Sequence, residues 1–417
     1  MGVLNILYNT RRLLYGFTQG KEDFSPATIK REIIRDNIFG VDIEQGAVDI
    51  ARLRFWLALV VDEIKPKPLP NLDYKIMCGN SLLSRHSLTT PINVVFAEYS
   101  RKNKISFTLT DYQKLVDDYT NTSDHSLKEE FRERISDIKS AFKTVLNNDI
   151  IKRRQKIEGQ ILTLESDTIF GPPAKENLKK AKELRKNYAK LLNTKENAEN
   201  DKLYADAFEW RFEFPTLLDN NGDFQGFDIV IGNPPYLRIQ GLRDTNPTFA
   251  EELVNKYQSA TGSFDLYAIF AERGLQIINK NGIVNYIMPV KWTNASFGSG
   301  LRSVITENDS ACKIINFGAY QVFNASTYTA LQWFKPNSNE LLYYELDHNL
   351  ENNQELGEYL NSLNSNNAAK INAAKLSKEA WVLTVGAITD ILNKLDKQPL
   401  RLSDIFDKIY QGLATSK

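Results

Sequence analysis

One short stretch near the middle of the chain constrains the fold more than any other. Phe227–Ile231 is dominated by apolar, β-branched side chains, Gly232 follows it, and Asn233–Tyr236 reads Asn-Pro-Pro-Tyr. Such a run indicates a strand that is buried on both faces of a parallel sheet. Because prolines stop a strand, the last four residues should form a rigid loop at its carboxyl end. In open α/β sheets, ligands bind at this edge.

The loop has the chemistry to hold an amine. Pro234 and Pro235 have fixed φ angles and no N–H, so no donor competes for the carbonyl oxygens around them. The side-chain oxygen of Asn233 and the carbonyl of Pro234 could therefore accept hydrogen bonds from one small donor. Tyr236 offers a flat ring, and stacking on such a ring is worth about 1–3 kcal/mol per base in nucleic-acid sites. Asn-Pro-Pro is also an ordinary turn, but the preceding strand and glycine favour a site.

Composition narrows the classes of partner. The chain has 417 residues, with 52 Lys and Arg against 52 Asp and Glu. Because its net charge is zero, any nucleic-acid binding must come from a local patch. Cys78 and Cys312 are too few and too distant for a disulfide framework, and His86, His125 and His348 are scattered. We therefore expect no metal site, a reducing cytoplasmic location and, since no stretch is long and apolar enough, no membrane span.

A second candidate site lies at the end of an earlier strand. The apolar run Ile38–Val41 ends on Asp42, and an amphipathic helix follows with Val48 and Phe55 on its apolar face. A carboxylate at the tip of such a strand can accept hydrogen bonds from ribose hydroxyls. The alternative is that Asp42 or Glu44 only caps the helix. Together with the Asn-Pro-Pro-Tyr loop, the ribose role is favoured.

A third strand is expected at Tyr74–Cys78, directly before Gly79 and Asn80. This pair is also compatible with a plain Gly-Asn turn. Further strands are expected at Ile283–Pro289, Ile314–Phe317 and Tyr343–Leu346, with a helix from Leu266 between them. Strands that alternate with helices on this scale predict an α/β sheet.

A charged insert separates the two candidate sites. From about Asp124 to Asn200 the chain is rich in Lys, Arg and Glu, with apolar residues at helical spacing on both sides of Gly171-Pro172-Pro173. This pattern predicts a helical hairpin, whose charges are either a solvated face or a DNA-clamping arm. The aromatic segment Phe208–Pro215 after it is expected to be core and rim packing. Phe297–Gly300, with two glycines, is interpreted as a flexible loop.

From about residue 1 to 335 the chain resembles adenine-specific DNA methyltransferases of the fused restriction–modification type (type IIG) and related phage-defence methyltransferases. The resemblance rests on an ordered set of motifs: Gly-Val-Asp-Ile at 40–43, Gly-Asn-Ser-Leu at 79–82, the long insert, Ile-Gly-Asn-Pro-Pro-Tyr at 231–236, Ser-Phe-Asp-Leu-Tyr at 263–267 and Met-Pro-Val-Lys-Trp at 288–292. It implies an α/β, Rossmann-like, mixed but mostly parallel sheet of the class I methyltransferase type, with an inserted helical arm.

The resemblance also implies roles for particular residues. The cofactor S-adenosyl-L-methionine would be bound by Asp42, Ile43, Asn80, Ser81 and Leu82, with Asn80 hydrogen-bonded to its adenine.

The catalytic residues would be Asn233, Pro234, Pro235 and Tyr236, and the flipped adenine of double-stranded DNA would stack on Tyr236 and Phe297. A fused or separate nuclease and a specificity module are further expected partners.

Four segments are expected. They are 1–120, the first part of the methyltransferase core; 121–205, the charged helical insert; 206–350, the second part of the core with the catalytic motif; and 351–417, a linker and the start of a target recognition domain. The last assignment rests on the tail from Leu402 to Ser416.

The predicted function is methylation of the N6 amine of adenine in DNA, within a restriction–modification or phage-defence system. One alternative is methylation of protein glutamine, which presents a similar planar amine, although enzymes of that kind are compact and this chain carries a long insert. Another is a non-enzymatic remnant that holds DNA or a partner.

One expected motif is missing. Methyltransferases of this kind need a glycine-rich turn after the first strand, and no such turn precedes Asp42. The amino-terminal helix, Met1–Leu14, resembles the helix that follows that turn. We therefore expect Met1 to be an internal position of a longer protein and the chain to be a fragment with reduced or no activity. The missing strand would leave exposed apolar surface in the sheet.

Overall fold

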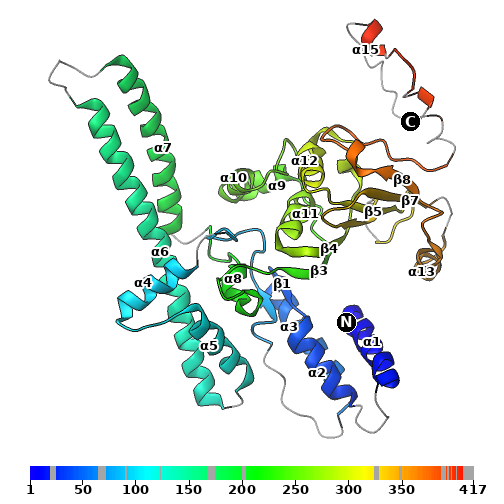
Figure 1. Ribbon diagram of the computed structural model, residues 1–417, viewed down its shortest axis with the longest axis horizontal. Helices are drawn as coiled ribbons and strands as arrows, with labels where there is room; N and C mark the ends of the chain where they lie inside the picture. The colour runs from blue at the N-terminus through cyan, green and yellow to red at the C-terminus, as the bar shows by residue number, and fades with distance from the viewer. Residues whose placement is uncertain are drawn as a thin grey trace. The chain divides into compact units, whose positions relative to one another are not determined.

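The computed structural model (Figure 1) describes residues 1–18, 25–63, 72–89, 92–122, 124–166, 174–199, 203–323, 328–346, 350–386, 391, 394–395, 397–400 and 402–406. Two compact units make up the chain, Met1–Gln225 and Gly226–Lys417. The four segments expected from the sequence stay a prediction, because compactness does not test what each segment does.

The first unit begins with three helices, α1 (Gly2–Thr18), α2 (Pro26–Asn37) and α3 (Gln45–Val60). They pack around an apolar cluster that contains Leu4, Ile33, Ile34, Val48, Phe55 and Leu59. The amino-terminal helix that the sequence predicts is therefore present, and its Leu4 is fully buried.

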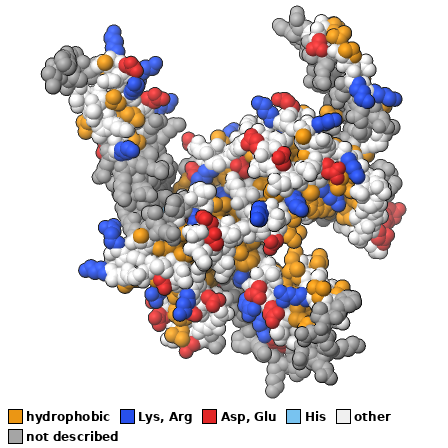
Figure 2. Space-filling view, in the orientation of Figure 1, with side chains coloured by type: hydrophobic (Ala, Val, Ile, Leu, Met, Phe, Trp, Pro, Cys, Tyr) orange, Lys and Arg blue, Asp and Glu red, His pale blue; other side chains and the backbone are white. Residues whose placement is uncertain are grey.

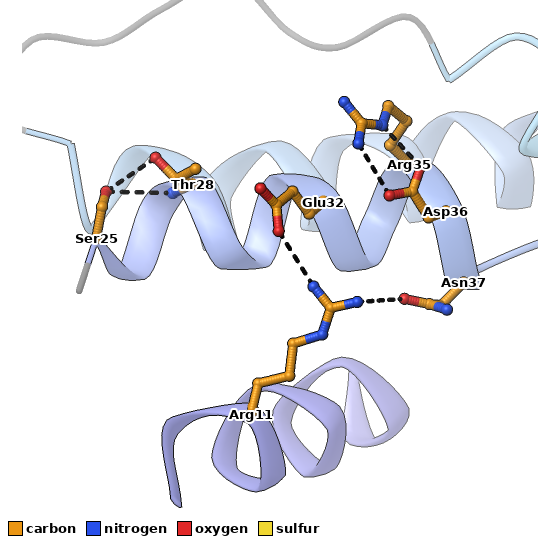
Figure 3. A network of polar contacts seen from close by, with 7 residues as sticks. All are labelled: Arg11, Ser25, Thr28, Glu32, Arg35, Asp36 and Asn37. Carbon is orange, nitrogen blue, oxygen red and sulfur yellow. Dashed lines mark hydrogen bonds and ion pairs between the residues drawn. The ribbon is translucent and has the colours of Figure 1, made fainter. Parts of the chain in front are cut away.

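Polar contacts define where α2 begins and how α1 is held to it (Figure 3). Ser25 caps α2 by accepting a hydrogen bond from the backbone N–H of Thr28 at 3.4 Å, and Pro26 follows it in the first turn. Arg11 of α1 donates to Glu32 at 3.2 Å and to Asn37 at 3.3 Å. One side chain thus joins the two helices at two places.

Two short parallel strands, β1 (Gly40–Asp42) and β2 (Ile76–Cys78), pair with Asp42 opposite Cys78. α3 packs against both strands. Just before β2, Lys75 is only 8% exposed, and its ammonium group lies 3.9 Å from the centroid of the Phe39 ring. Burial lowers the pKa of Lys75 to about 8.

The charged insert is a helical arm, as predicted. It contains α6 (His125–Glu165) and α7 (Lys175–Glu199), which lie side by side (Figure 1); α4 (Asn93–Asn103) and α5 (Leu109–Asn121) precede the insert and pack against α6. Asp124 caps α6 by accepting from the N–H groups of the second and third residues after it. The predicted break at Gly171–Pro173 lies outside the described residues.

The base of the arm is an apolar cluster of α4, α5, α6, the short helix α8 (Trp210–Glu213) and Leu218, which follows the short helix η2 (Pro215–Leu217). The prediction that Phe208–Pro215 is core packing is confirmed for its aromatic residues. Phe208, Trp210, Phe212 and Phe214 are all at most 6% exposed.

The second unit is built on a six-stranded sheet of order β3-β4-β6-β5-β7-β8. The strands are β3 (Phe227–Gly232), β4 (Ile278–Met288), β5 (Ala311–Asn316), β6 (Ala330–Phe334), β7 (Glu340–Glu345) and β8 (Ala369–Asn372). β3 is parallel to β4 and β5 to β7, whereas β6 and β8 pair antiparallel with their neighbours. The prediction of an α/β fold with a mixed sheet is confirmed.

Helices cover both faces of this sheet. Val284 and Met288 of β4 pack in one cluster with α11 (Leu266–Ile277) and α12 (Ser299–Glu307). Ile287, which points to the opposite face, packs in a second cluster with α13 (Asn353–Ser362). Shorter elements follow the strands: α9 (Ile239–Thr245), α10 (Pro247–Lys256), η3 (Lys291–Thr293), η4 (Ser296–Gly298), η5 (Ala373–Lys375) and α15 (Leu402–Ile405).

Two expectations are wrong. β3 is a strand but is not buried on both faces, since Ile229 and Ile231 are 62% and 61% exposed; among the described residues it pairs with β4 alone. Phe297–Gly300 is not a flexible loop, because η4 and the start of α12 occupy it. Its Gly298 is needed for close packing: a Cβ atom there would lie 1.8 Å from the carbonyl oxygen of Trp292.

Candidate active site

The Asn-Pro-Pro-Tyr loop begins where β3 ends, at the carboxyl edge of a parallel strand pair. β3 and β4 run in register with Gly232 opposite Tyr286. A Cβ atom on Gly232 would come within 3.1 Å of the Tyr286 ring, so glycine allows the two strands to pack closely here. Pro234 is buried, whereas Asn233 is exposed and Tyr236 is partly buried. The Asn233 carboxamide is therefore accessible on an anchored loop.

The hydroxyl of Tyr236 orients the Asn233 side chain. It lies 2.9 Å from the side-chain oxygen Oδ1 of Asn233 and 2.9 Å from the carbonyl oxygen of Ile287 in β4. Both partners are acceptors, so the one hydroxyl proton is shared between them. Partial burial raises the pKa of Tyr236 to about 12. The phenol is therefore a hydrogen-bond donor at neutral pH, and it ties the loop to the neighbouring strand.

The Ser-Phe-Asp-Leu-Tyr motif holds the other side of the loop. Leu237 and Phe264 form the backbone contacts: the N–H of Ile239 donates to the carbonyl of Phe264 at 3.0 Å, and the N–H of Leu266 donates to the carbonyl of Leu237 at 2.9 Å. These bonds bring Tyr267 against Tyr236, with ring centroids 6.3 Å apart and ring planes at 83°. The motif alone does not indicate a role for Tyr267, because its contact with Tyr236 depends on a pairing between segments that are distant in sequence.

Phe297 follows the carboxyl end of β4, the strand beside β3. Its backbone carbonyl accepts a hydrogen bond from Thr261 Oγ1 at 2.9 Å, and its ring is only partly buried against the core. Tyr236 packs against the same core cluster. The structure thus brings the predicted catalytic and base-stacking residues to one edge of one sheet.

Arg302 of α12 fixes the segment that leads to Phe297. Only 3% exposed, it donates to the backbone carbonyls of Trp292 at 2.5 Å, Ala295 at 2.8 Å and Lys378 at 2.8 Å. Burial lowers the pKa of its guanidinium group. No sequence pattern indicated this role, since a buried arginine looks like any surface arginine in an amphipathic helix.

The predicted cofactor residues meet at the carboxyl edge of β1 and β2, within the first unit. The carbonyl of Asp42 accepts a hydrogen bond from the N–H of Gly79 at 2.8 Å, and Cys78 Sγ lies 3.4 Å from the carbonyl of Ile43. Asp42 Oδ1 accepts from the N–H of Glu44 at 2.9 Å, while Glu44 caps α3 without a side-chain hydrogen bond. The Asp42 carboxylate is exposed and has a second oxygen, which can accept further hydrogen bonds.

Asn80 follows β2 and is 9% exposed. Its Oδ1 accepts from the N–H of Leu82 at 3.1 Å, and its backbone N–H donates to the carbonyl of Asp206 at 2.5 Å. The Ser81 carbonyl accepts from the indole N–H of Trp210 at 3.2 Å, and the Leu82 side chain is only 2% exposed. The aromatic segment after the arm therefore holds this loop, a support that sequence reasoning did not identify.

The candidate residues thus fall into two groups. Asp42, Ile43 and Asn80–Leu82 come together in the first unit, whereas Asn233–Tyr236 and Phe297 come together in the second. Among the residues that the structure describes, no group of three or more His, Cys, Asp or Glu side chains is arranged to hold a metal ion. In the same part of the chain, no helix has the length and apolarity to cross a membrane.

Strands alternate with helices in this fold, and the Asn-Pro-Pro-Tyr loop lies at the carboxyl end of one strand. Comparison with known proteins identifies the family that shares these features. The model of the family "Eco57I restriction-modification methylase" matches residues 36–323, which is more than half of the chain. The chain belongs to this family, and the resemblance that the sequence motifs predicted is confirmed.

Individual relatives share shorter stretches. The type II restriction enzyme and methyltransferase RM.Eco57I of Escherichia coli is 32% identical over 46% of this chain and 19% of its own length. The type II methyltransferase M.BstVI of Geobacillus stearothermophilus is 33% identical over 20% of this chain and 14% of its own length. The matched regions are therefore less than a fifth of either relative.

Among solved structures, the methyltransferase subunit of a type I restriction–modification system from Streptococcus thermophilus is similar. It matches at 18% identity over 36% of this chain and 35% of its own chain, with a TM-score of 0.26.

Proposed function

We propose that this protein transfers a methyl group from S-adenosylmethionine to the N6 amine of an adenine in duplex DNA. The observation that carries the proposal is the Asn233 carboxamide, accessible at the carboxyl edge of β3 and oriented by the Tyr236 hydroxyl at 2.9 Å. Membership in a family of restriction–modification methylases supports the reaction class.

The protein's contribution would be positioning and oriented dipoles. Asn233 Oδ1 has two lone pairs, and one of them remains for a second donor when the Tyr236 hydroxyl occupies the other. Together with the Pro234 carbonyl, it would accept both protons of an exocyclic amine and turn the nitrogen lone pair towards the methyl donor. Oriented acceptors of this kind act without a strong base.

The target base must leave the duplex to reach this loop, which costs a few kcal/mol. The rings of Tyr236 and Phe297, both partly exposed at the same sheet edge, would offset this cost by stacking on the flipped base. Tyr267, packed edge-on against Tyr236, would keep that ring in one orientation.

The first unit has groups that suit the donor molecule. S-adenosylmethionine supplies an electrophilic methyl group when it is bound. The exposed Asp42 carboxylate would accept hydrogen bonds from its ribose hydroxyls. At Asn80, the amide NH2 would donate to a ring nitrogen of adenine, while Oδ1 accepts from the Leu82 N–H and keeps a second lone pair.

The test is Asn233→Ala in a version of the protein that transfers methyl. Loss of one oriented polar group should lower the rate of transfer to adenine-containing duplexes by about 100-fold or more. Cofactor binding, measured by calorimetry, should be unchanged, because Asn233 is not among the residues assigned to the cofactor. A glutamine-containing protein substrate serves as the comparison. An unchanged rate with Asn233→Ala, or preferential methylation of glutamine, would contradict the proposal.

A further inference from the structure

The helical arm carries a one-sided stripe of lysines. Lys175, Lys179, Lys182 and Lys186 are all exposed on α7 and are spaced by four, three and four residues. At about 100° per residue, they lie within an arc of about 60° along the helix. The stripe is about 16 Å long, at about 1.5 Å of rise per residue.

The stripe faces away from the rest of the arm. Ala181, which is fully buried, and Tyr188, which is hydrogen-bonded to Glu158 of α6, mark the face of α7 that packs on α6. By the same helical spacing, these two residues lie roughly opposite the lysines. The stripe is therefore the solvent side of the hairpin, and Figure 2 shows Lys and Arg side chains along the described part of the arm.

The lysines of the stripe have no acidic partners among the described residues. The nearby cations outside the stripe do: Lys180 pairs with Glu176 at 3.0 Å, and Arg185 pairs with Glu165 of α6 at 2.7 Å. Two carboxylates that could neutralise the stripe, Glu176 and Glu165, are therefore already paired with cations outside it. In a chain whose net charge is zero, this is a local concentration of positive charge.

This arrangement weakens the helix when no anion is near. Like charges three or four residues apart destabilise a helix by about 0.2–0.5 kcal/mol per pair. A solvated face normally mixes the two signs so that such neighbours attract. A row of phosphates would relieve the repulsion, and over about 16 Å one strand of duplex DNA presents about five of them. Lysines, as point charges without bidentate geometry, suit contacts that do not depend on base sequence.

We propose that the Lys175–Lys179–Lys182–Lys186 stripe binds the phosphate backbone of duplex DNA. The inference rests on the proposed function for its choice of DNA as the partner. It adds a non-specific electrostatic contact on the arm, separate from the loop that would hold the target base.

The test measures binding of the full chain to a fluorescent duplex, without cofactor, across a salt series from about 50 to 200 mM. The variant replaces all four lysines by glutamine, which has a similar helix propensity. Each lost phosphate contact should flatten the slope of log K against log salt by about 0.9, so four contacts would flatten it by up to about 3.6. The matched arginine variant keeps the charge and should keep the slope.

A second glutamine variant controls for net charge. Lys104, Lys114, Lys375 and Lys378 are exposed and form no ion pair among the described residues. Their replacement removes the same charge and should leave the slope within about one contact of the parent. Circular dichroism checks that α7 remains folded in both variants.

The outcomes separate this inference from the proposed function. Equal slopes for the stripe variant and the parent, or no binding of the duplex by the parent at low salt, would overturn the inference. Binding of DNA through the stripe, with no transfer of a methyl group to adenine, would overturn the proposed function and leave the inference standing.

Discussion

Removal of the Tyr236 hydroxyl should show how much methyl transfer depends on this one hydrogen-bond donor. Tyr236→Phe removes the donor that lies 2.9 Å from Asn233 Oδ1 and 2.9 Å from the Ile287 carbonyl, but keeps the ring. Because one proton serves both acceptors, the loss is that of a single hydrogen bond, about 1 kcal/mol or about fivefold. The freed carboxamide can also rotate. Complete loss of the Asn233 side chain should cost about 100-fold, which sets the upper limit.

We therefore expect Tyr236→Phe to lower the rate of methyl transfer by about 5- to 20-fold. Tyr236→Ala also removes the stacking surface, worth about 1–3 kcal/mol, and should lower the rate by a further factor of about 5 or more. Binding of the duplex should be unchanged in Tyr236→Phe and weaker in Tyr236→Ala.

The assay is single-turnover transfer of a labelled methyl group to an adenine-containing duplex, in a version of the protein that transfers methyl. Anisotropy of the same duplex measures binding separately. The reasoning is refuted if Tyr236→Phe is as fast as the parent, since the hydroxyl would then not position Asn233. It is also refuted if the Phe and Ala variants are equally slow, because the ring would then have no role in stacking.

Three further predictions concern stability, measured by thermal unfolding. Burial lowers the folded-state pKa of Lys75 to about 8, below its unfolded value of about 10.5, so stability should rise as the pH increases from about 8 to about 10.5; Lys75→Met should raise Tm at pH 7 and abolish that rise. Arg302→Met removes the donor of one buried carbonyl, that of Trp292, and of two partly buried ones, and an orphaned buried carbonyl costs about 1–3 kcal/mol, so the free energy of unfolding should fall by at least about that amount; a smaller loss than about 1 kcal/mol would contradict the role of Arg302. Gly298→Ala places a Cβ atom 1.8 Å from the Trp292 carbonyl oxygen and should be strongly destabilising, whereas Gly241→Ala, an exposed helix position whose Cβ would meet nothing closer than 3.8 Å, should be neutral or stabilising; equal effects would show that the clash is not decisive.

Patterns of apolar residues, glycine and proline predicted the strands and helices that depend on neighbouring residues in the sequence. The apolar run before Gly232 and the prolines after it were sufficient for β3 and its loop. The apolar spacing within the insert, on both sides of Gly171–Pro173, was sufficient for α6 and α7.

Partners distant in sequence determine what was missed. β6 was not predicted because polar Gln332 occupies its centre. That side chain is fully buried, and it is satisfied by the carbonyl of Met288 at 2.8 Å and the indole N–H of Trp292 at 2.8 Å. No pattern within the strand reveals such compensation.

The candidate site divides in the same way. The residue types at Asp42, Asn80 and Asn233 could be identified from motifs, since each lies at the end of a strand or shortly after it. The bond from Tyr236 to the Ile287 carbonyl depends on the register of β3 and β4, and the need for glycine at position 298 depends on the approach of Trp292. Such requirements are set by packing, and one sequence does not display them.

The contact between Asn80 and the segment after the arm has a consequence for how the chain can be rearranged. The N–H of Asn80 bonds to the carbonyl of Asp206, and Asn80 bridges to Ala207, so everything between them leaves and returns to one point. Because the two ends of this insert are already held together, its length can change at small entropic cost. The entropy of loop closure depends only logarithmically on the length of the loop. The end of α6 and the start of α7 can therefore be shortened or extended together without disturbing the Asn80 anchor.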